Sequence, residues 1–232
     1  MSTNLSGNIL TLNNTSLEES YIKEIHKRFY VPDNCKAGDT VILDGIECLC
    51  VATGVTIQGS NLTRIAVDKN HDLGYYQKYV GINQNKIVTK YINRWLWGGY
   101  GTALGDTSVE VGYGLQNTIK CLAKVVNYTK GTYPTNNYDG YPWLWQGVND
   151  FRSSHSDKWF VPSYYELGNC VRPYASSLTF DTATGGSYSD SFISSSEHGS
   201  EYYEASAFDP NTYPSLGNKG MAIMSVRLCR AF

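Results

Sequence analysis

Residues 198–218 have the composition of a recognition surface. They read HGSEYYEASAFDPNTYPSLGN, with three tyrosines among serine, asparagine and glycine and few aliphatic side chains. Tyrosine gives a wide contact area at low entropic cost, and small polar residues supply adaptable hydrogen bonds. We therefore predict a ligand-binding site formed by His198, Ser200, Tyr202, Tyr203, Asp209, Asn211, Tyr213 and Ser215. An ordinary polar loop, which favours the same residue types, is the alternative.

The histidines offer no comparable pattern for catalysis. His26, His71, His155 and His198 have no second histidine three or four positions along the chain. A hydrolytic triad would need a third group that the sequence does not locate. Gly98-Gly99-Tyr100-Gly101 lacks the lysine of a phosphate-binding loop. We expect surface histidines, no enzymatic activity, no cofactor and no metal.

The six cysteines are scattered through the chain, at positions 35, 48, 50, 121, 170 and 229. Cys48 and Cys50 fall on an expected strand and would face the same side of it. A metal site is possible there, but buried small side chains are more common. We predict that most of the cysteines are reduced core residues.

Several elements must position these residues. An Asp44-Gly45 turn between two apolar runs predicts a β-hairpin from residue 41 to residue 51. Further strands are expected over residues 62–67, 159–161, 192–196 and 205–208, with a closing strand between residue 222 and Phe232. Apolar spacing predicts helices over residues 115–126 and from Pro142 to Phe151.

The binding segment should connect two of these strands. We expect the strand at residues 192–196 and the terminal strand to form a rigid floor, with the segment crossing the surface between them. Ser163 and Glu166 have the spacing of a capping box, which predicts a helix over residues 163–171.

The first thirty-two residues differ from the rest. A polar tail precedes a possible capping box at Ser16 and Glu19, and Leu17, Tyr21, Ile25 and Phe29 then recur every four residues as one helical stripe. We predict an attachment segment over residues 1–32 and one domain over residues 33–232. Packing of the stripe on its own domain is the alternative to docking or oligomerisation.

Three ordered blocks carry a family resemblance. W-F-x-P-S-x-x-E-L from Trp159, S-S-S-E from Ser194 and the terminal V-R-x-x-R-A-F resemble the C-type-lectin-like domains of the formylglycine-generating-enzyme superfamily. The Lcl C-terminal-like branch is the most similar, together with variable proteins of diversity-generating retroelements and phage tropism determinants. The resemblance implies an α+β C-type-lectin-like fold with mixed short strands, two or three helices and long loops.

That resemblance also implies a function. We expect a non-enzymatic phage virion protein, of the receptor-binding, head-fibre or tail-fibre type, that recognises a host cell-surface protein or glycan. We expect it to contact other virion proteins through residues 1–32 and to form a homo-oligomer. One alternative is a formylglycine-generating-type oxidase, but these copper enzymes use two nearby cysteines, and Cys229 stands alone in the late part of the chain. The other alternative is a structural virion decoration protein without a ligand.

Calcium also has to be weighed, because C-type lectins often bind sugar through it. Only Val148-Asn149-Asp150 and Asp209-Pro210-Asn211 are similar to their calcium-binding triplets, and in reversed order. Calcium takes about six to eight oxygen ligands, more than these triplets supply.

Charge and hydropathy exclude other classes. The formal charge is −2 and no Lys/Arg run is present, which argues against nucleic acid as a partner. No apolar run approaches the roughly 18 residues of a membrane span, so we expect no membrane insertion. The N-terminus has no basic and apolar signal-peptide pattern. These features suit a virion protein that assembles in the host cytoplasm.

Overall fold

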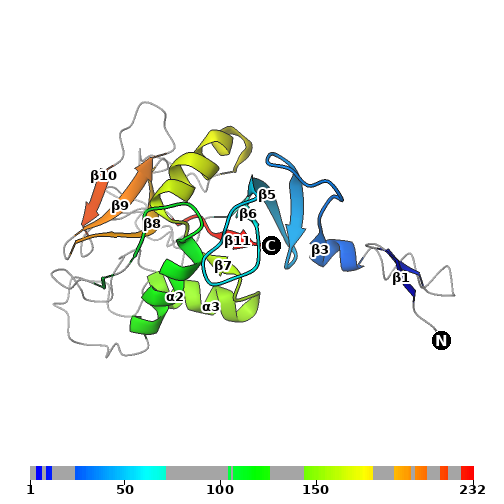
Figure 1. The fold of residues 1–232 in the computed structure, drawn as a ribbon, viewed down its shortest axis with the longest axis horizontal. Coiled ribbons are helices and arrows are strands. Elements are labelled where there is room, and N and C mark those ends of the chain that lie inside the picture. The colour runs from blue at the N-terminus through cyan, green and yellow to red at the C-terminus, as the bar shows by residue number, and fades with distance from the viewer. Residues whose placement is uncertain are drawn as a thin grey trace, which may run out of the picture.

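The computed structural model describes residues 4–6, 9–11, 24–71, 104–105, 107–125, 144–179, 191–199, 202–207, 215–218 and 226–232. Within them the fold is mixed α+β, with antiparallel sheets and a few helices. Figure 1 shows a three-stranded sheet at one end of the long axis and the hairpin of the larger sheet towards the other end. No helix among the described residues has both the length and the apolar character needed to cross a membrane.

The larger sheet has six strands in the order β3-β4-β5-β6-β11-β7. Their bounds are β3 Phe29–Tyr30, β4 Thr40–Leu43, β5 Ile46–Thr53, β6 Arg64–Asp68, β11 Cys229–Ala231 and β7 Trp159–Phe160. The hairpin β4–β5 is confirmed, and Asp44 and Gly45 both have positive φ, 55° and 83°. That conformation is the two-residue turn whose twist matches the flanking strands.

Both faces of this sheet are buried, because successive residues of its strands enter two different core clusters. Cys48 and Cys50 pack in one cluster with Trp159, which agrees with the prediction that their side chains lie on the same face of the strand. Leu49 and Phe160 pack in the other cluster. A nearly continuous apolar run over residues 48–51 is therefore explained by burial on both sides.

The two helices predicted from apolar spacing are present and pack against the core, although Ile119 of the predicted apolar face is exposed. Helix α2 spans Gly114–Val125 and α3 spans Leu144–Ser154, and Trp145 of α3 is fully buried. The helix expected over residues 163–171 takes a different form. After a short helical start at residues 164–165, η1 (Glu166–Val171) is a π-helix, and η2 (Arg172–Ser177) is a 3₁₀-helix.

The second sheet contains β8 (Ser191–His198), β9 (Tyr202–Ala207) and β10 (Ser215–Asn218), with β9 in the middle. A small hairpin, β1 (Asn4–Ser6) and β2 (Ile9–Thr11), precedes the body of the chain. Of the expected closing strand, residues 226–232 are described, and they contain a bridge at Val226 and strand β11, whereas residues 222–225 lie outside the described residues.

The predicted N-terminal segment enters the larger sheet. The described part of its helix covers residues 24–28, and Phe29 then belongs to strand β3 and not to the helical stripe. Phe29 and Tyr30 pair with Leu43 and Ile42 of β4, and the amide of Gly45 donates to the carbonyl of Arg28 at 2.8 Å. Strand β3 thus lies within the predicted segment 1–32 and pairs with the predicted domain 33–232.

Candidate functional site

Four of the eight predicted binding residues lie on the three-stranded sheet formed by β8, β9 and β10. Tyr202 and Tyr203 are the first two residues of β9, and Ser215 is the first of β10. In the register, Tyr202 lies opposite both His198 of β8 and Asn218 of β10. The sheet therefore brings three positions from residues 198–218 into one row. Ser200, Asp209, Asn211 and Tyr213 lie outside the described residues.

Two features of this region differ from the prediction. The sequence predicts a surface connection with one short strand at residues 205–208, whereas the structure has β9 from Tyr202 to Ala207 and also β10 from Ser215 to Asn218. The two strands expected to form the floor are not neighbours in the described sheets: β8 pairs with β9, and β11 pairs with β6 and β7. Alternation of apolar residues predicts a buried face but does not identify the neighbouring strand.

Strand β8 is fixed to the body by its three serines, all of which are buried. The Ser196 hydroxyl donates to the carbonyl of Ser108 at 2.8 Å and accepts from the amide of Tyr164 at 3.0 Å. The amide of Ser195 donates to the carbonyl of Pro162 at 2.8 Å. The sequence predicted that these serines lie on a strand, but not that their hydrogen bonds fix the strand to the rest of the domain.

The next residue, Glu197, ties the end of β8 to a distant segment. Its two carboxylate oxygens accept from the amides of Leu104 and Gly105 at 2.8 and 2.9 Å. The amide of Glu197 donates to the hydroxyl of Thr107 at 2.9 Å. His198, the next residue, is exposed at the end of β8. The row of His198, Tyr202 and Asn218 therefore starts directly after the anchored residue Glu197.

Glu166 is the centre of a buried junction. The capping box is confirmed: the amide of Ser163 donates to Glu166 Oε2 at 2.7 Å, and the amide of Glu166 donates to Ser163 Oγ at 3.2 Å. The other carboxylate oxygen accepts from the amides of Gly112 and Gly114, at 2.8 and 3.4 Å, where α2 begins. Burial raises the pKa of Glu166 to about 7, although these hydrogen bonds oppose the shift.

The cysteines are free and buried, as predicted. Cys170 and Cys229 share one core cluster, so the structure brings together two cysteines that the sequence separates. Burial raises the pKa of Cys170 to about 11 and that of Cys229 well above its usual value. These environments disfavour the thiolate, which is the reactive form.

The four histidines, His26, His71, His155 and His198, are exposed, as predicted. His71 Nδ1 lies 3.2 Å from Asp68 Oδ1, and burial raises the pKa of the Asp68 carboxyl group. Asn149 and Asp150 are exposed on α3. Within the part of the chain that the structure describes, no group of three His, Cys, Asp or Glu residues could hold a metal ion.

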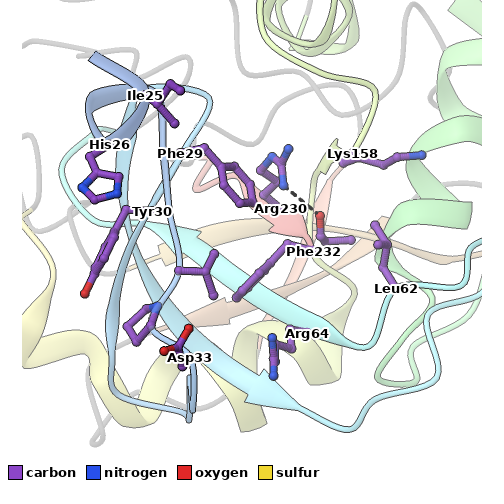
Figure 2. Close-up of a pocket in the computed structure, with 13 residues that line it drawn as sticks. Ile25, His26, Phe29, Tyr30, Asp33, Leu62, Arg64, Lys158, Arg230 and Phe232 are labelled. Atoms are coloured by element: carbon purple, nitrogen blue, oxygen red, sulfur yellow. Dashed lines mark hydrogen bonds between the residues drawn. The ribbon is translucent and has the colours of Figure 1, made fainter. Parts of the chain in front are cut away.

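The sequence missed a pocket at the other end of the molecule. Its volume is about 720 Å³, and it opens between the segment at residues 25–33 and the strands β6 and β11. In the view of Figure 2, His26 and Tyr30 lie on one side of the pocket, and Arg64 and Lys158 lie on the other. Phe29 and Phe232 supply further apolar surface.

The cations of this pocket differ in their surroundings. Arg230 is bound to Asp44 by two hydrogen bonds, at 2.7 and 3.1 Å. The guanidinium of Arg64 lies 6.0 Å from the centre of the Phe232 ring, within the range of a cation–π contact. Lys158 lies 3.5 Å from Asp157, and both of these side chains are well exposed. Asp33 is the single acidic residue among the described residues that line the pocket.

Comparisons with known proteins add no assignment: no family model, no curated protein and no solved structure matches the chain.

Proposed function

We propose that the chain is a non-enzymatic recognition protein with a C-type-lectin-like domain, carried on a phage virion, that binds a host cell-surface protein or glycan. The ligand contacts residues in the segment 198–218. Residues 1–32 attach the domain to the particle.

The row formed by His198, Tyr202 and Asn218 is the observation that carries this proposal. It lies on a sheet whose first strand is held by buried serines and by Glu197. Rigid support lowers the entropic cost of presenting contact residues to a partner. The connection between β9 and β10, which contains Asp209, Asn211 and Tyr213, begins and ends on this support.

A second candidate, a formylglycine-generating-type copper oxidase, is favoured by one observation. Cys170 and Cys229 belong to the same core cluster, and each could supply a thiolate. Their complete or nearly complete burial and raised pKa values argue for structural side chains instead. Tight Cu(I) binding that Cys229→Ser abolishes, together with oxygen consumption on a cysteine-containing peptide, would favour the oxidase.

The test of recognition is an alanine scan of residues 198–218 in the full chain. Binding of the labelled protein to a panel of bacterial cells is measured together with the melting temperature. We expect Tyr202→Ala, Tyr203→Ala or Tyr213→Ala to weaken binding about thirty-fold, the usual effect of losing a central aromatic contact. The matched control is Tyr165→Ala, which removes an exposed tyrosine from outside the segment.

Loss of binding only in variants that also unfold would remove this site from the proposal. A chain that binds no cell but still joins a particle would favour the structural decoration protein.

A further inference from the structure

The pocket beside β3 carries an exposed apolar surface. Ile25, Phe29 and Tyr30 line it with 38%, 48% and 43% of their surface exposed. Among the described residues, five large hydrophobic side chains are exposed to this degree, and three of them gather here. Such clustering marks an interaction site more often than it marks free surface.

Three cations, Arg64, Lys158 and Arg230, and one acidic residue, Asp33, line this pocket. No acidic side chain of the described residues pairs with Arg64. Its backbone is fixed by two hydrogen bonds: the Arg64 amide donates to the carbonyl of Phe232 at 3.1 Å, and the amide of Phe232 donates to the Arg64 carbonyl at 3.0 Å. Lys158 adds a second cation at the same pocket. A complementary occupant would present apolar side chains next to carboxylates.

The chain itself contains such a segment. Residues 17–21 read LEESY, in which Leu17 and Tyr21 flank Glu18 and Glu19. These residues lie outside the described ranges, and the sequence predicts that they continue the helix found at residues 24–28. On a helix, Leu17 and Tyr21 share one face, and Glu18 adjoins it.

We propose that this pocket binds residues 17–21 of a second copy of the chain, so that two copies form a reciprocal dimer. Ile25 belongs to the wall of the chain's own pocket. If the helix at residues 24–28 continued to residue 17, Tyr21 and Leu17 would lie about 6 and 12 Å from Ile25 along the axis, beyond the wall that Ile25 forms. In the proposed dimer this segment enters the pocket of the partner copy, and twofold symmetry makes the exchange mutual. Such a dimer would form whether or not the chain recognises a host cell.

Charge reversal gives a sharp test, read by sedimentation and light scattering of the full chain. We expect the wild type to be a dimer that dissociates more readily at high salt. Arg64→Glu should weaken dimerisation at least tenfold, and so should the pair Glu18→Arg with Glu19→Arg. An equimolar mixture of the two variants should form a heterodimer. The altered pocket of the first variant then meets the altered segment of the second, and the unaltered pocket of the second meets the unaltered segment of the first.

Lys36→Glu is the matched control, since Lys36 is exposed and is not a lining residue of the pocket. It should leave the dimer intact. If Arg64→Glu fails to fold by circular dichroism, Lys158→Glu takes its place in the same experiment. The proposal would be overturned by a monomeric wild type, or by a dimer that neither Arg64→Glu nor Lys158→Glu weakens. A mixture of pocket and segment variants that remains monomeric would also overturn it.

Discussion

Arg230 in the last strand forms a two-bond ion pair with Asp44, in the turn between β4 and β5. The Nε–Oδ2 and Nη2–Oδ1 distances are 2.7 and 3.1 Å, and Trp159 Nε1 donates to the same Oδ2 at 2.8 Å. One carboxylate thus joins the turn between β4 and β5 to strands β7 and β11, which follow much later in the chain. Both charged side chains are mostly buried, with 10% and 21% of their surface exposed.

Asp44→Asn should destabilise the fold by about 2 kcal/mol, because it leaves a mostly buried arginine without its counter-charge. Asparagine tolerates the positive φ of this position, so the turn itself should persist. Urea unfolding measures the loss. Asp157→Asn is the control, since its exposed pair with Lys158 should contribute almost nothing. Equal effects of the two substitutions would contradict the assigned role of Asp44.

Glu166 should make stability depend on pH. Its pKa in the folded chain, about 7, lies above the ordinary value of 4.5. The folded state therefore holds this proton over a range in which the unfolded state has lost it. The free energy of unfolding should fall as the pH rises from 4.5 through 7, by about 3 kcal/mol from this group.

Glu166→Gln provides the comparison, because it cannot ionise. Asp68, whose pKa is also raised, acts in the same direction but contributes equally to both proteins. The difference in unfolding free energy between wild type and variant should therefore change between pH 5 and pH 8. A difference that stays constant over this range would show that Glu166 does not titrate there.

Ser163→Ala should lower the free energy of unfolding by about 1–3 kcal/mol. The hydroxyl caps the amide of Glu166 and also donates to the carbonyl of Glu110 at 2.8 Å, in a fully buried position. Thermal melting and cell binding should be measured on the same preparation. Binding by the folded variant should equal that of the wild type, and a loss of binding at unchanged stability would place Ser163 in the ligand site.

Gly114→Ala should be at least as damaging, by about 2–4 kcal/mol, because overpacking at a rigid site has no simple relief. An added Cβ would lie 2.1 Å from Glu166 Oε2 and 2.8 Å from the ring of Phe160. The melting temperature measures the effect. A mild result would mean that Glu166 can move away from the start of α2.

Features set by neighbouring residues could be predicted from the sequence. The Asp44-Gly45 turn specifies its hairpin, and Ser163 specifies its bond to Glu166 three positions later. Features set by distant residues could not be predicted. Glu166 also binds Gly112, 54 positions earlier, and Arg230 binds Asp44 across 186 positions. No local pattern encodes such pairs, since they depend on how the sheets assemble.

The candidate site shows the same limit. Tyrosine-rich composition selected residues 198–218, but it could not distinguish a surface connection from strands β9 and β10. The placement of β8 and β11 in separate sheets depends on strand partners that alternation does not specify. The pocket beside β3 was missed because its lining comes from four separated stretches of the chain.

Two truncations should separate attachment from folding. Residues 1–23 contribute none of the described pairings of the larger sheet, whereas residues 24–32 contribute β3, the bond between Gly45 and Arg28, and Val31, which packs on the core. Deleting residues 1–23 should leave the free energy of unfolding close to that of the full chain. Deleting residues 1–32 should leave a folded domain that is less stable by about 1–3 kcal/mol, because β4 then becomes an unpaired edge.

Both truncated chains should be monomeric, since both lack residues 17–21. Both should also no longer join the particle, since both lack most of the proposed attachment segment 1–32. Urea unfolding and sedimentation are measured on the two truncations side by side with the full chain. If removal of residues 1–23 alone unfolds the chain, those residues belong to the core and not to an attachment segment. If the shorter truncation still dimerises, the contact between copies lies elsewhere than in residues 17–21.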